Sequence, residues 1–220
     1  MSEEIALFPL ASVVLFPRVR TPLHVFEPRY RQMTEDALAG ERSIGMVAVP
    51  PEHAGAMAGD PPVYPVGCAG VISQARRLPD GRFHIVLDGA FRFRILAEAP
   101  RPAGRLYRVA SIERLADAYD PAERERVEEL RGRILGLVRS LLELSDRERA
   151  KEITPELFRS MDDEALVNTL ANALALGTPE KQGLLETPSV PERYARLEGL
   201  LAFRRAELGF PGVRGSGRVH

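Results

Sequence analysis

The spacing of apolar residues along this chain changes once, near residues 115–120. Before that point, apolar and polar residues alternate with a period of two and are interrupted by Gly and Pro, which is typical of short β-strands. After it, apolar residues recur every three or four positions, which is typical of amphipathic helices. The pattern therefore predicts a β-rich first half followed by a helical second half.

The clearest strands in the first half form an antiparallel meander. A hairpin is predicted over 74–87, because an Asp-Gly dipeptide at 80–81 separates two alternating runs. Residues 91–95 alternate aromatic and aliphatic residues with arginines, so we expect Arg92 and Arg94 on the solvated face of that strand. Further strands are expected at 5–10, 13–16, 23–26 and 107–112.

Prolines limit the length of the opening strands, because proline cannot donate a ladder hydrogen bond. Several short strands separated by bends suit a small closed or nearly closed barrel. One helix is expected among them, with Pro28 in its first turn and Gly40 at its end. Residues 50–65 show no periodicity, and a loop of that length in a compact domain is usually functional or mobile.

The second half carries clear helix signals. Asp120-Pro121-Ala122-Glu123 combines a capping residue, a proline in the first turn and a reciprocal glutamate. Helices are also expected at 163–176, closed by Gly177, and at 190–208, with Leu208 on the buried stripe. Further start signals are Ser145 with Glu148, Thr154-Pro155, Thr178-Pro179, and Ser189 with Glu192.

These patterns define the expected organisation. The fold class is α+β, with a mostly antiparallel β-barrel domain over residues 1–117 and an α-helical bundle domain over residues 118–209. The tail 210–220 is rich in Gly and Arg and has too little apolar content to pack, so we expect it to be disordered.

Composition restricts where the protein works and what it contacts. The formal net charge is −1, so no overall field attracts the chain to nucleic acid or to an anionic membrane. No apolar run approaches the ~18 residues of a membrane span, and no secretory signal is visible. The single cysteine, Cys68, excludes an internal disulfide and suits a reducing compartment. We therefore expect a cytoplasmic protein.

The residues needed for common catalytic and metal sites are missing or badly placed. No glycine-rich phosphate loop occurs, and the only lysines, Lys151 and Lys181, lie in polar runs where a lysine base is not expected. The four histidines are scattered, so we expect no metal and no cofactor. Cys68 lies between Gly67 and Gly70, where the backbone can approach a neighbouring segment closely. It is expected to be a small buried residue of a tight strand or, alternatively, a reactive thiol.

Aromatic residues and arginines interleave over 76–94, which raises the possibility of an RNA- or phosphate-binding barrel. Strict alternation, however, directs Phe91 and Phe93 to the opposite face of the sheet from the arginines. Aromatic side chains in a core cannot stack on bases, so nucleic-acid binding is the weaker alternative.

The order of residues in the opening segments resembles the amino-terminal substrate-binding domain of ATP-dependent Lon proteases, which has a PUA-like fold. These segments are Leu7-Phe8-Pro9-Leu10, Val14-Leu15-Phe16-Pro17 and Leu23-His24-Val25-Phe26-Glu27-Pro28-Arg29-Tyr30-Arg31. The similarity continues through 67–72, 78–83 and 87–93, and more weakly through 180–186 and 192–197 in the helical half. The resemblance implies a non-catalytic module that binds unfolded or degron-bearing polypeptide, with a protease or a chaperone as a second partner. It leaves the oligomeric state open.

The resemblance and the loop together suggest residues that contact a peptide. Glu27 and Arg29 lie at the expected strand-to-helix junction, and Met57 and Tyr64 lie on the long loop. The alternative for Glu27 and Arg29 is an internal cap or salt bridge, and the alternative for Met57 and Tyr64 is closure of the barrel mouth. A third class of function, a hydrolase that uses Cys68 or a histidine, is the least supported.

Overall fold

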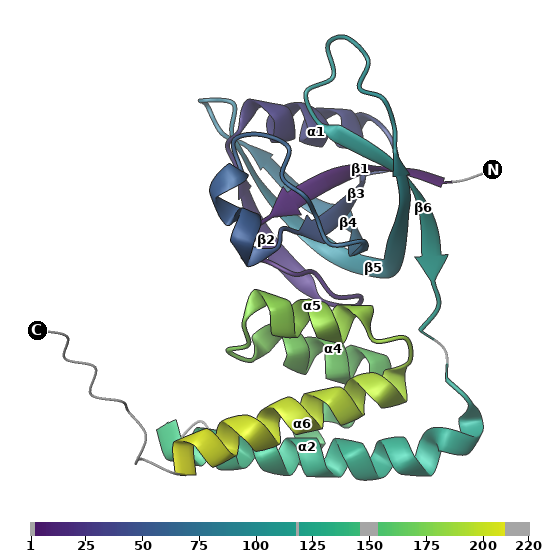
Figure 1. The fold of residues 1–220 in the computed structure, drawn as a ribbon, viewed down its shortest axis with the longest axis vertical. Coiled ribbons are helices and arrows are strands. Elements are labelled where there is room, and N and C mark those ends of the chain that lie inside the picture. Colours follow the sequence, from purple (N-terminus) through teal and green to yellow (C-terminus); the bar gives the residue numbers. More distant parts are fainter. Residues whose placement is uncertain (1–2, 118, 146–153, 210–220) are drawn as a thin grey trace, which may run out of the picture.

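The computed structural model describes residues 3–117, 119–145 and 154–209, which form a curled β-sheet above two layers of helices (Figure 1). The strands are β1 (Glu3–Leu10), β2 (Arg20–Val25), β3 (Ser43–Ala48), β4 (Val66–Arg77), β5 (Phe83–Glu98) and β6 (Arg108–Leu115). The helices are α1 (Pro28–Ala39), α2 (Arg124–Ser145), α4 (Asp163–Ala173), α5 (Thr178–Glu186) and α6 (Val190–Gly209). Three short 3-10 helices complete the fold, η1 (Pro51–Ala56), η2 (Pro121–Glu123) and η3 (Pro155–Phe158).

The sheet is mixed, and this corrects the expectation of a closed barrel. Its strand order is β2-β5-β4-β3-β1-β6, with β1 parallel to β3 and the other neighbouring strands antiparallel. The second half of β5 also pairs with β6, so the sheet curls strongly. Within the described residues β2 pairs with β5 alone, which leaves one edge of β2 free. The α+β class and the mainly antiparallel character are confirmed.

The predicted hairpin is confirmed, but other strand predictions need correction. Gly81 has a φ of 80°, the left-handed conformation that the turn requires. The runs predicted at 82–87 and 91–95 are one continuous strand, β5. Residues 13–16 are not a strand; they form a buried loop that packs against Gly89, where a Cβ atom would lie 2.0 Å from the Phe16 carbonyl oxygen. Gly89 is therefore required because any side chain there would clash with this loop.

The strand β3 was not predicted, and its burial explains why. Five of its residues are buried on both faces of the sheet, from Ile44 to Ala48. A strand that is covered on both sides has no polar face, so it lacks the alternation from which a strand is usually recognised.

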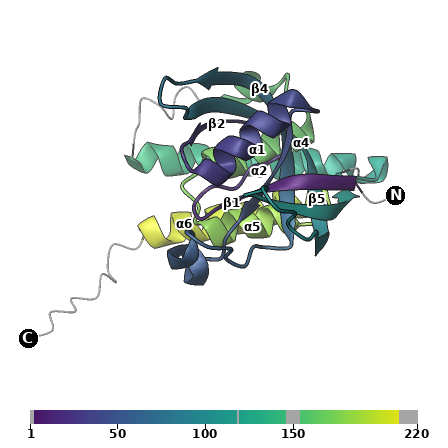
Figure 2. The ribbon, with the colours of Figure 1, turned by 90° about the horizontal axis from the view of Figure 1, so that it is seen from above.

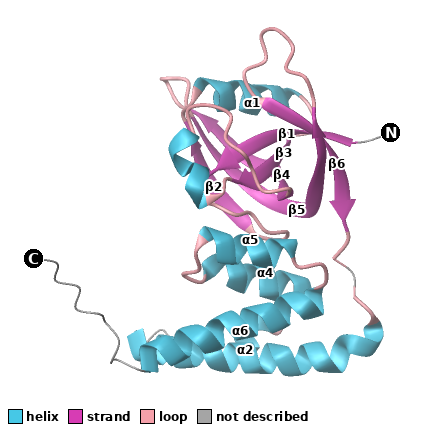
Figure 3. Cartoon of the chain, viewed as in Figure 1, coloured by secondary structure: helices cyan, strands magenta, loops and turns pink. Residues whose placement is uncertain are grey.

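Most helices lie at one end of the sheet (Figure 3). The helices α4 and α5 are next to the sheet, and α2 and α6 lie side by side beneath them (Figure 1). Viewed from above, α1 crosses the opposite end of the sheet (Figure 2). One hydrophobic cluster runs from the sheet into the helices and includes Phe8, Leu15, Val127, Leu166 and Leu197. The two halves therefore share a core.

Several capping predictions are confirmed. The Asp120 carboxylate accepts a hydrogen bond from Ala122 N at 2.8 Å, and Ser189 Oγ accepts one from Glu192 N at 3.3 Å. Gly177 was predicted to end a helix and instead precedes α5 as its N-cap, while Leu208 is exposed rather than buried. Ser145 is the last residue of α2, while Glu148, its partner in the predicted cap, and the tail 210–220 fall outside the described residues. The domain boundary after residue 117 stays a prediction.

Candidate functional site

A long connection between β3 and β4, which we call loop 50–65, presents a mostly exposed surface with little charge. Only Glu52, His53 and Asp60 in it are acidic or basic residues, and the other residues are Pro, Ala, Gly, Met, Val and Tyr. Its alanines and most of its prolines are exposed, and Met57, Val63 and Tyr64 are half-buried. Exposed apolar surface of this kind is a common feature of sites that bind polypeptides.

Arg29, at the start of α1, fixes the middle of loop 50–65. Its guanidinium donates to Met57 O and, at 2.6 Å, to Gly59 O. It also forms an ion pair with Glu27 at 2.9 Å, and its side chain is mostly buried. The alternative role predicted for Glu27 and Arg29, a salt bridge that fixes the strand-to-helix junction, is thus present. Glu27 precedes the helix without a side-chain cap bond.

Two further arginines hold the second half of the loop. Arg101 donates to the Asp60 carboxylate at 2.9 Å. Arg108, on β6, donates to Pro61 O at 2.8 Å and forms an ion pair with Glu98. Sequence reasoning missed both arginines, since nothing in the sequence connects them to a loop more than forty residues away. Together with Arg29 they keep loop 50–65 in one conformation.

The two predicted loop residues differ in their surroundings. Met57 is half-buried where Arg29 binds its carbonyl group. Tyr64 lies at the other end of the loop, where its backbone N–H donates to Ala48 O at 2.9 Å and its ring packs against the core. Burial and the nearby carboxylates of Glu52 and Glu186 raise the pKa of the Tyr64 hydroxyl. The structure thus brings Glu27, Arg29 and Met57 together and places Tyr64 apart from them.

A second arginine cluster joins the sheet to the helices, and it overturns the prediction that Arg92 is solvated. The Arg92 side chain is 1% exposed. Its Nε donates to the Asp117 carboxylate at 2.8 Å. Its two remaining nitrogens donate at 2.9–3.0 Å to four carbonyl oxygens, those of Ala116, Leu185, Thr187 and Pro188. All five N–H donors of the guanidinium are satisfied, which explains how the charge tolerates burial.

Arg193, on α6, completes this cluster from the helical side. It is fully buried and binds Asp117 at 2.5 Å and Asn168 Oδ1 at 2.8 Å. The Asn168 amide in turn donates to Pro17 O at 3.1 Å, in the buried loop after β1. We call Arg92, Asp117 and Arg193 the junction cluster. It ties β5, the connection to α2, and α6 together through one carboxylate.

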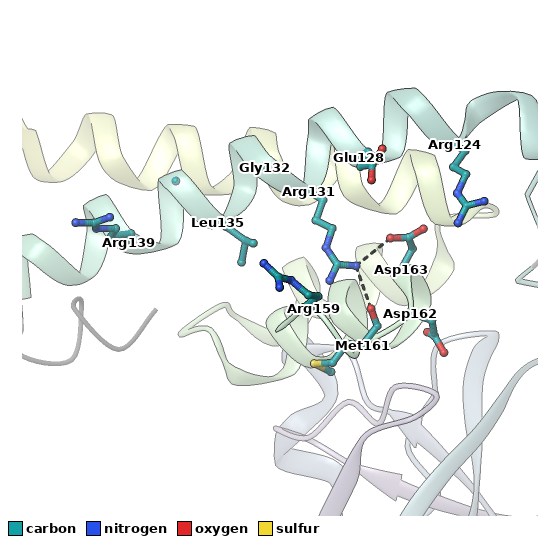
Figure 4. Close-up of a pocket in the computed structure, with 11 residues that line it drawn as sticks. Arg124, Glu128, Arg131, Gly132, Leu135, Arg139, Arg159, Met161, Asp162 and Asp163 are labelled. Carbon is teal, nitrogen blue, oxygen red and sulfur yellow. Dashed lines mark hydrogen bonds and ion pairs between the residues drawn. The ribbon is translucent and has the colours of Figure 1, made fainter. Parts of the chain in front are cut away.

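A cavity of about 690 Å³ lies between α2 and the start of α4 (Figure 4). Its floor is the face of α2 around Gly132, Leu135 and Gly136, and charged side chains surround it. Arg131 crosses it to bind Asp163 and the carbonyl of Met161, both at 3.1 Å (Figure 4). These contacts satisfy Arg131 internally, so the cavity is a surface groove with a structural ion pair inside it.

Neither Cys68 nor Lys181 has surroundings that suit a catalytic role. Cys68 is fully buried and burial raises the pKa of its thiol, which suits the structural role rather than a reactive one. Burial lowers the pKa of Lys181, but its ammonium donates to Asn172 O at 2.6 Å and not to a serine. Lys151 lies outside the described residues. In residues 3–117, 119–145 and 154–209, no group of three metal-binding side chains occurs, and no helix is long and apolar enough to span a membrane.

Comparison with known protein families gives a match over most of the chain. Residues 4–202 match the model of the ATP-dependent protease La (LON) substrate-binding domain. A Lon protease of Azospirillum brasilense is 30% identical over 215 residues, which are 91% of this chain and 24% of the relative. Lon protease 1 of Thermus thermophilus is 30% identical over 199 residues, or 90% of this chain and 24% of the relative. The chain thus spans about a quarter of the length of these curated relatives.

Solved structures show the same fold. The N-terminal domain of a Mycobacterium avium complex Lon protease superposes with a TM-score of 0.68 at 22% identity, covering 91% of this chain and 98% of that one. A Lon N-terminal domain protein from Xanthomonas campestris gives a TM-score of 0.58 at 23% identity with the same coverage. The strand-and-helix arrangement is therefore shared with both structures.

Proposed function

Because this chain belongs to the family of LON substrate-binding domains, we propose that it binds segments of unfolded or degron-bearing polypeptide and catalyses no reaction. A protease or a chaperone would be its second partner. The matched region corresponds to the substrate-binding domain of its relatives and not to an ATPase or a protease domain. The activity of whole Lon proteases is therefore not carried over to this chain.

The observation that carries this proposal is the fixed, exposed loop 50–65. Binding usually costs free energy because a loop must become ordered. Here Arg29, Arg101 and Arg108 already hold the loop through its carbonyl groups and Asp60. Its apolar side chains are then available to a partner without that ordering cost.

Within this proposal the four predicted residues have different tasks. Met57 and Tyr64 make apolar contact with the polypeptide, since methionine adapts to many partners and tyrosine supplies a large flat surface. Glu27 and Arg29 are positioning residues, because their side chains are occupied with each other and with the loop backbone.

RNA binding is less well supported. Phe83 and Phe93 are buried, and the guanidinium of Arg114 covers the ring of Phe91 at 3.9 Å. These aromatic rings are therefore not free to stack on bases, which is how barrels of this size hold single-stranded nucleic acid.

Fluorescence anisotropy with a labelled, permanently unfolded polypeptide tests the proposal. Met57→Ser should weaken binding about fivefold, the effect of losing roughly 1 kcal/mol at an interface. Leu208→Ser is the matched control, since Leu208 is equally apolar, is 60% exposed and lies at the far end of α6. The proposal fails if the wild-type chain does not bind the polypeptide, if both variants weaken binding equally, or if purified protein cleaves casein without ATP.

A further inference from the structure

The outer face of the sheet carries a row of basic side chains that runs across three strands. Arg76 on β4 lies opposite His84 on β5, and His84 lies opposite His24 on β2. All three side chains are exposed. We call Arg76, His84 and His24 the basic row; it ends at the free edge of β2.

Both histidines of the basic row accept hydrogen bonds from arginines. Arg76 Nη2 lies 3.0 Å from His84 Nδ1, and Arg82 Nη1 lies 3.4 Å from His24 Nε2. A guanidinium can only donate, so each imidazole nitrogen acts as the acceptor. The two histidine rings meet edge to face with centroids 4.8 Å apart. Cationic side chains are thus packed together with imidazoles between them.

A carboxylate near the basic row is already paired: Asp80 binds Arg82, the donor to His24, at 2.6 Å. Arg76 contacts no carboxylate in the part of the chain that the structure describes, and its recorded hydrogen bond is to His84. Other arginines on the same strands have acidic partners: Arg77 binds Glu35 at 3.1 Å and Arg20 binds Asp88 at 3.0 Å. An ion pair with a carboxylate adds a Coulomb attraction that an imidazole acceptor does not supply. An incoming carboxylate is therefore a better partner for Arg76 than the imidazole.

A hollow of about 640 Å³ lies over the same strands and has an apolar side. The next row of outward residues, Val86 and Pro22, lines it beside the basic row. Phe26 stacks on His24 with ring centroids 6.0 Å apart and is 58% exposed. The hollow thus offers basic donors on one side and apolar surface on the other.

We propose that this hollow binds an acidic, extended segment of polypeptide. The segment lies across the hollow over β2, β5 and β4, where the carboxylate of an Asp or Glu receives donors from Arg76 and from a ring N–H of His84 or His24. Apolar side chains two residues away contact Pro22 and Phe26. This inference rests on the proposed function, and it names the class of polypeptide that the protein selects.

Three labelled peptides test this proposal with the full chain. One alternates Glu and Val, and the other two replace each Glu with Gln or Lys. We expect the Glu peptide to bind at least tenfold more tightly than the Gln peptide, with an affinity that falls as salt is raised from 50 to 200 mM. The Lys peptide should not bind. Equal binding of the Glu and Gln peptides would overturn the proposal.

Paired variants locate the site. Arg76→Gln combined with His24→Gln should weaken the Glu peptide at least fivefold, while Arg94→Gln should not, because Arg94 is an exposed arginine of β5 that pairs with Glu113. Thermal unfolding checks that all variants fold. Equal loss in both variants would overturn the proposal, as would single-stranded RNA binding that the double variant abolishes while the Glu peptide does not bind.

The outcomes separate this inference from the proposed function. If unfolded polypeptide binds in a Met57-dependent way but the Glu peptide does not bind, the proposed function stands and the inference on acidic segments is wrong. If neither polypeptide binds, both fail.

Discussion

The junction cluster and the basic row place two arginines of neighbouring strands, Arg92 on β5 and Arg76 on β4, in opposite environments. Arg92 is buried and uses all five of its donors on carbonyl and carboxylate oxygens. Arg76 is exposed and donates to an imidazole. The difference lies in what the rest of the chain supplies: the end of α5 brings acceptors to Arg92, and no element brings a carboxylate to Arg76 in the described residues.

This contrast shows when an arginine holds a fold together and when it is available for binding. A buried guanidinium is tolerated only if all its N–H groups have acceptors. Removing Arg92 therefore leaves Asp117 and several carbonyl oxygens without their hydrogen-bond donor. An exposed guanidinium with a weak acceptor loses little when it changes partner. The first kind should therefore control stability, and the second should control affinity.

The largest expected effect is on stability at the junction cluster. Arg92→Ala should lower the free energy of unfolding by about 3–5 kcal/mol, because it leaves the buried Asp117 carboxylate with one cation and four carbonyl oxygens without this donor. Arg94→Ala, two residues away on β5 and exposed, should cost less than about 0.5 kcal/mol. Urea unfolding followed by circular dichroism measures both. Similar losses in the two variants would show that the burial of Arg92 is unimportant.

The rate at which Cys68 is labelled also distinguishes the buried Arg92 from the exposed Arg76. Cys68 lies opposite Arg92 in the β4–β5 pairing and is fully buried. A thiol reagent should therefore label native protein only as fast as the sheet opens. A loss of about 3 kcal/mol in Arg92→Ala raises the opening population about a hundredfold, since 1.4 kcal/mol is a factor of ten, and labelling should accelerate accordingly. Arg76→Gln should leave the rate unchanged. Rapid labelling of the wild-type protein would contradict a buried thiol.

A smaller effect is expected when only the charge at the centre of the junction cluster is removed. Asp117→Asn keeps an acceptor for Arg92 and Arg193 but leaves both cations without an anion, which should cost about 2 kcal/mol. If the Asp117 carboxylate couples the sheet to the helices, Asp117→Asn should lose its helical circular dichroism and expose Cys68 at different urea concentrations. Coincident transitions at the wild-type midpoint would show that the charge does not contribute.

The smallest effect concerns Glu164, at the margin of the junction cluster. Burial, together with repulsion from Asp117, raises the pKa of this carboxyl group. A carboxyl whose pKa is raised on folding favours the folded state below its unfolded pKa of about 4.3 and loses that contribution as the pH rises. Glu164→Gln should therefore raise the stability at pH 7 by no more than about 0.5 kcal/mol. The gain should disappear near pH 4; a gain that is constant with pH would exclude this cause.

Much of the fold follows from local patterns. The hairpin at Asp80-Gly81 and the helix that begins at Pro28 depend on residues next to each other in sequence, and both are confirmed. The strand β3 could not be recognised because both of its faces are buried. The parallel pairing of β1 with β3 depends on contacts that no local pattern records.

The site was harder to predict than the fold. The opening motif led to the prediction of Glu27 and Arg29. Arg29 binds the backbone of loop 50–65, and Glu27 forms an ion pair with Arg29. Arg101 and Arg108 could not be found, because their partners are distant in sequence. Alternation placed Arg92 on the solvated face, and its face is indeed opposite that of Phe93. What alternation cannot show is that the end of α5 and the residues after it cover Arg92.

The long-range contacts of β1 and Arg92 determine how late in synthesis the fold can be completed. β1 pairs with β6 through Glu3 and Ile112, and Arg92 binds carbonyl groups as far along the chain as Pro188. At a translation rate of about 5–20 residues per second, Arg92 is made roughly 5–20 s before its last acceptor, Pro188. During that interval the Arg92 guanidinium lacks its carbonyl partners, so the junction cluster can be completed only after α5 and the first turn of α6 have been made.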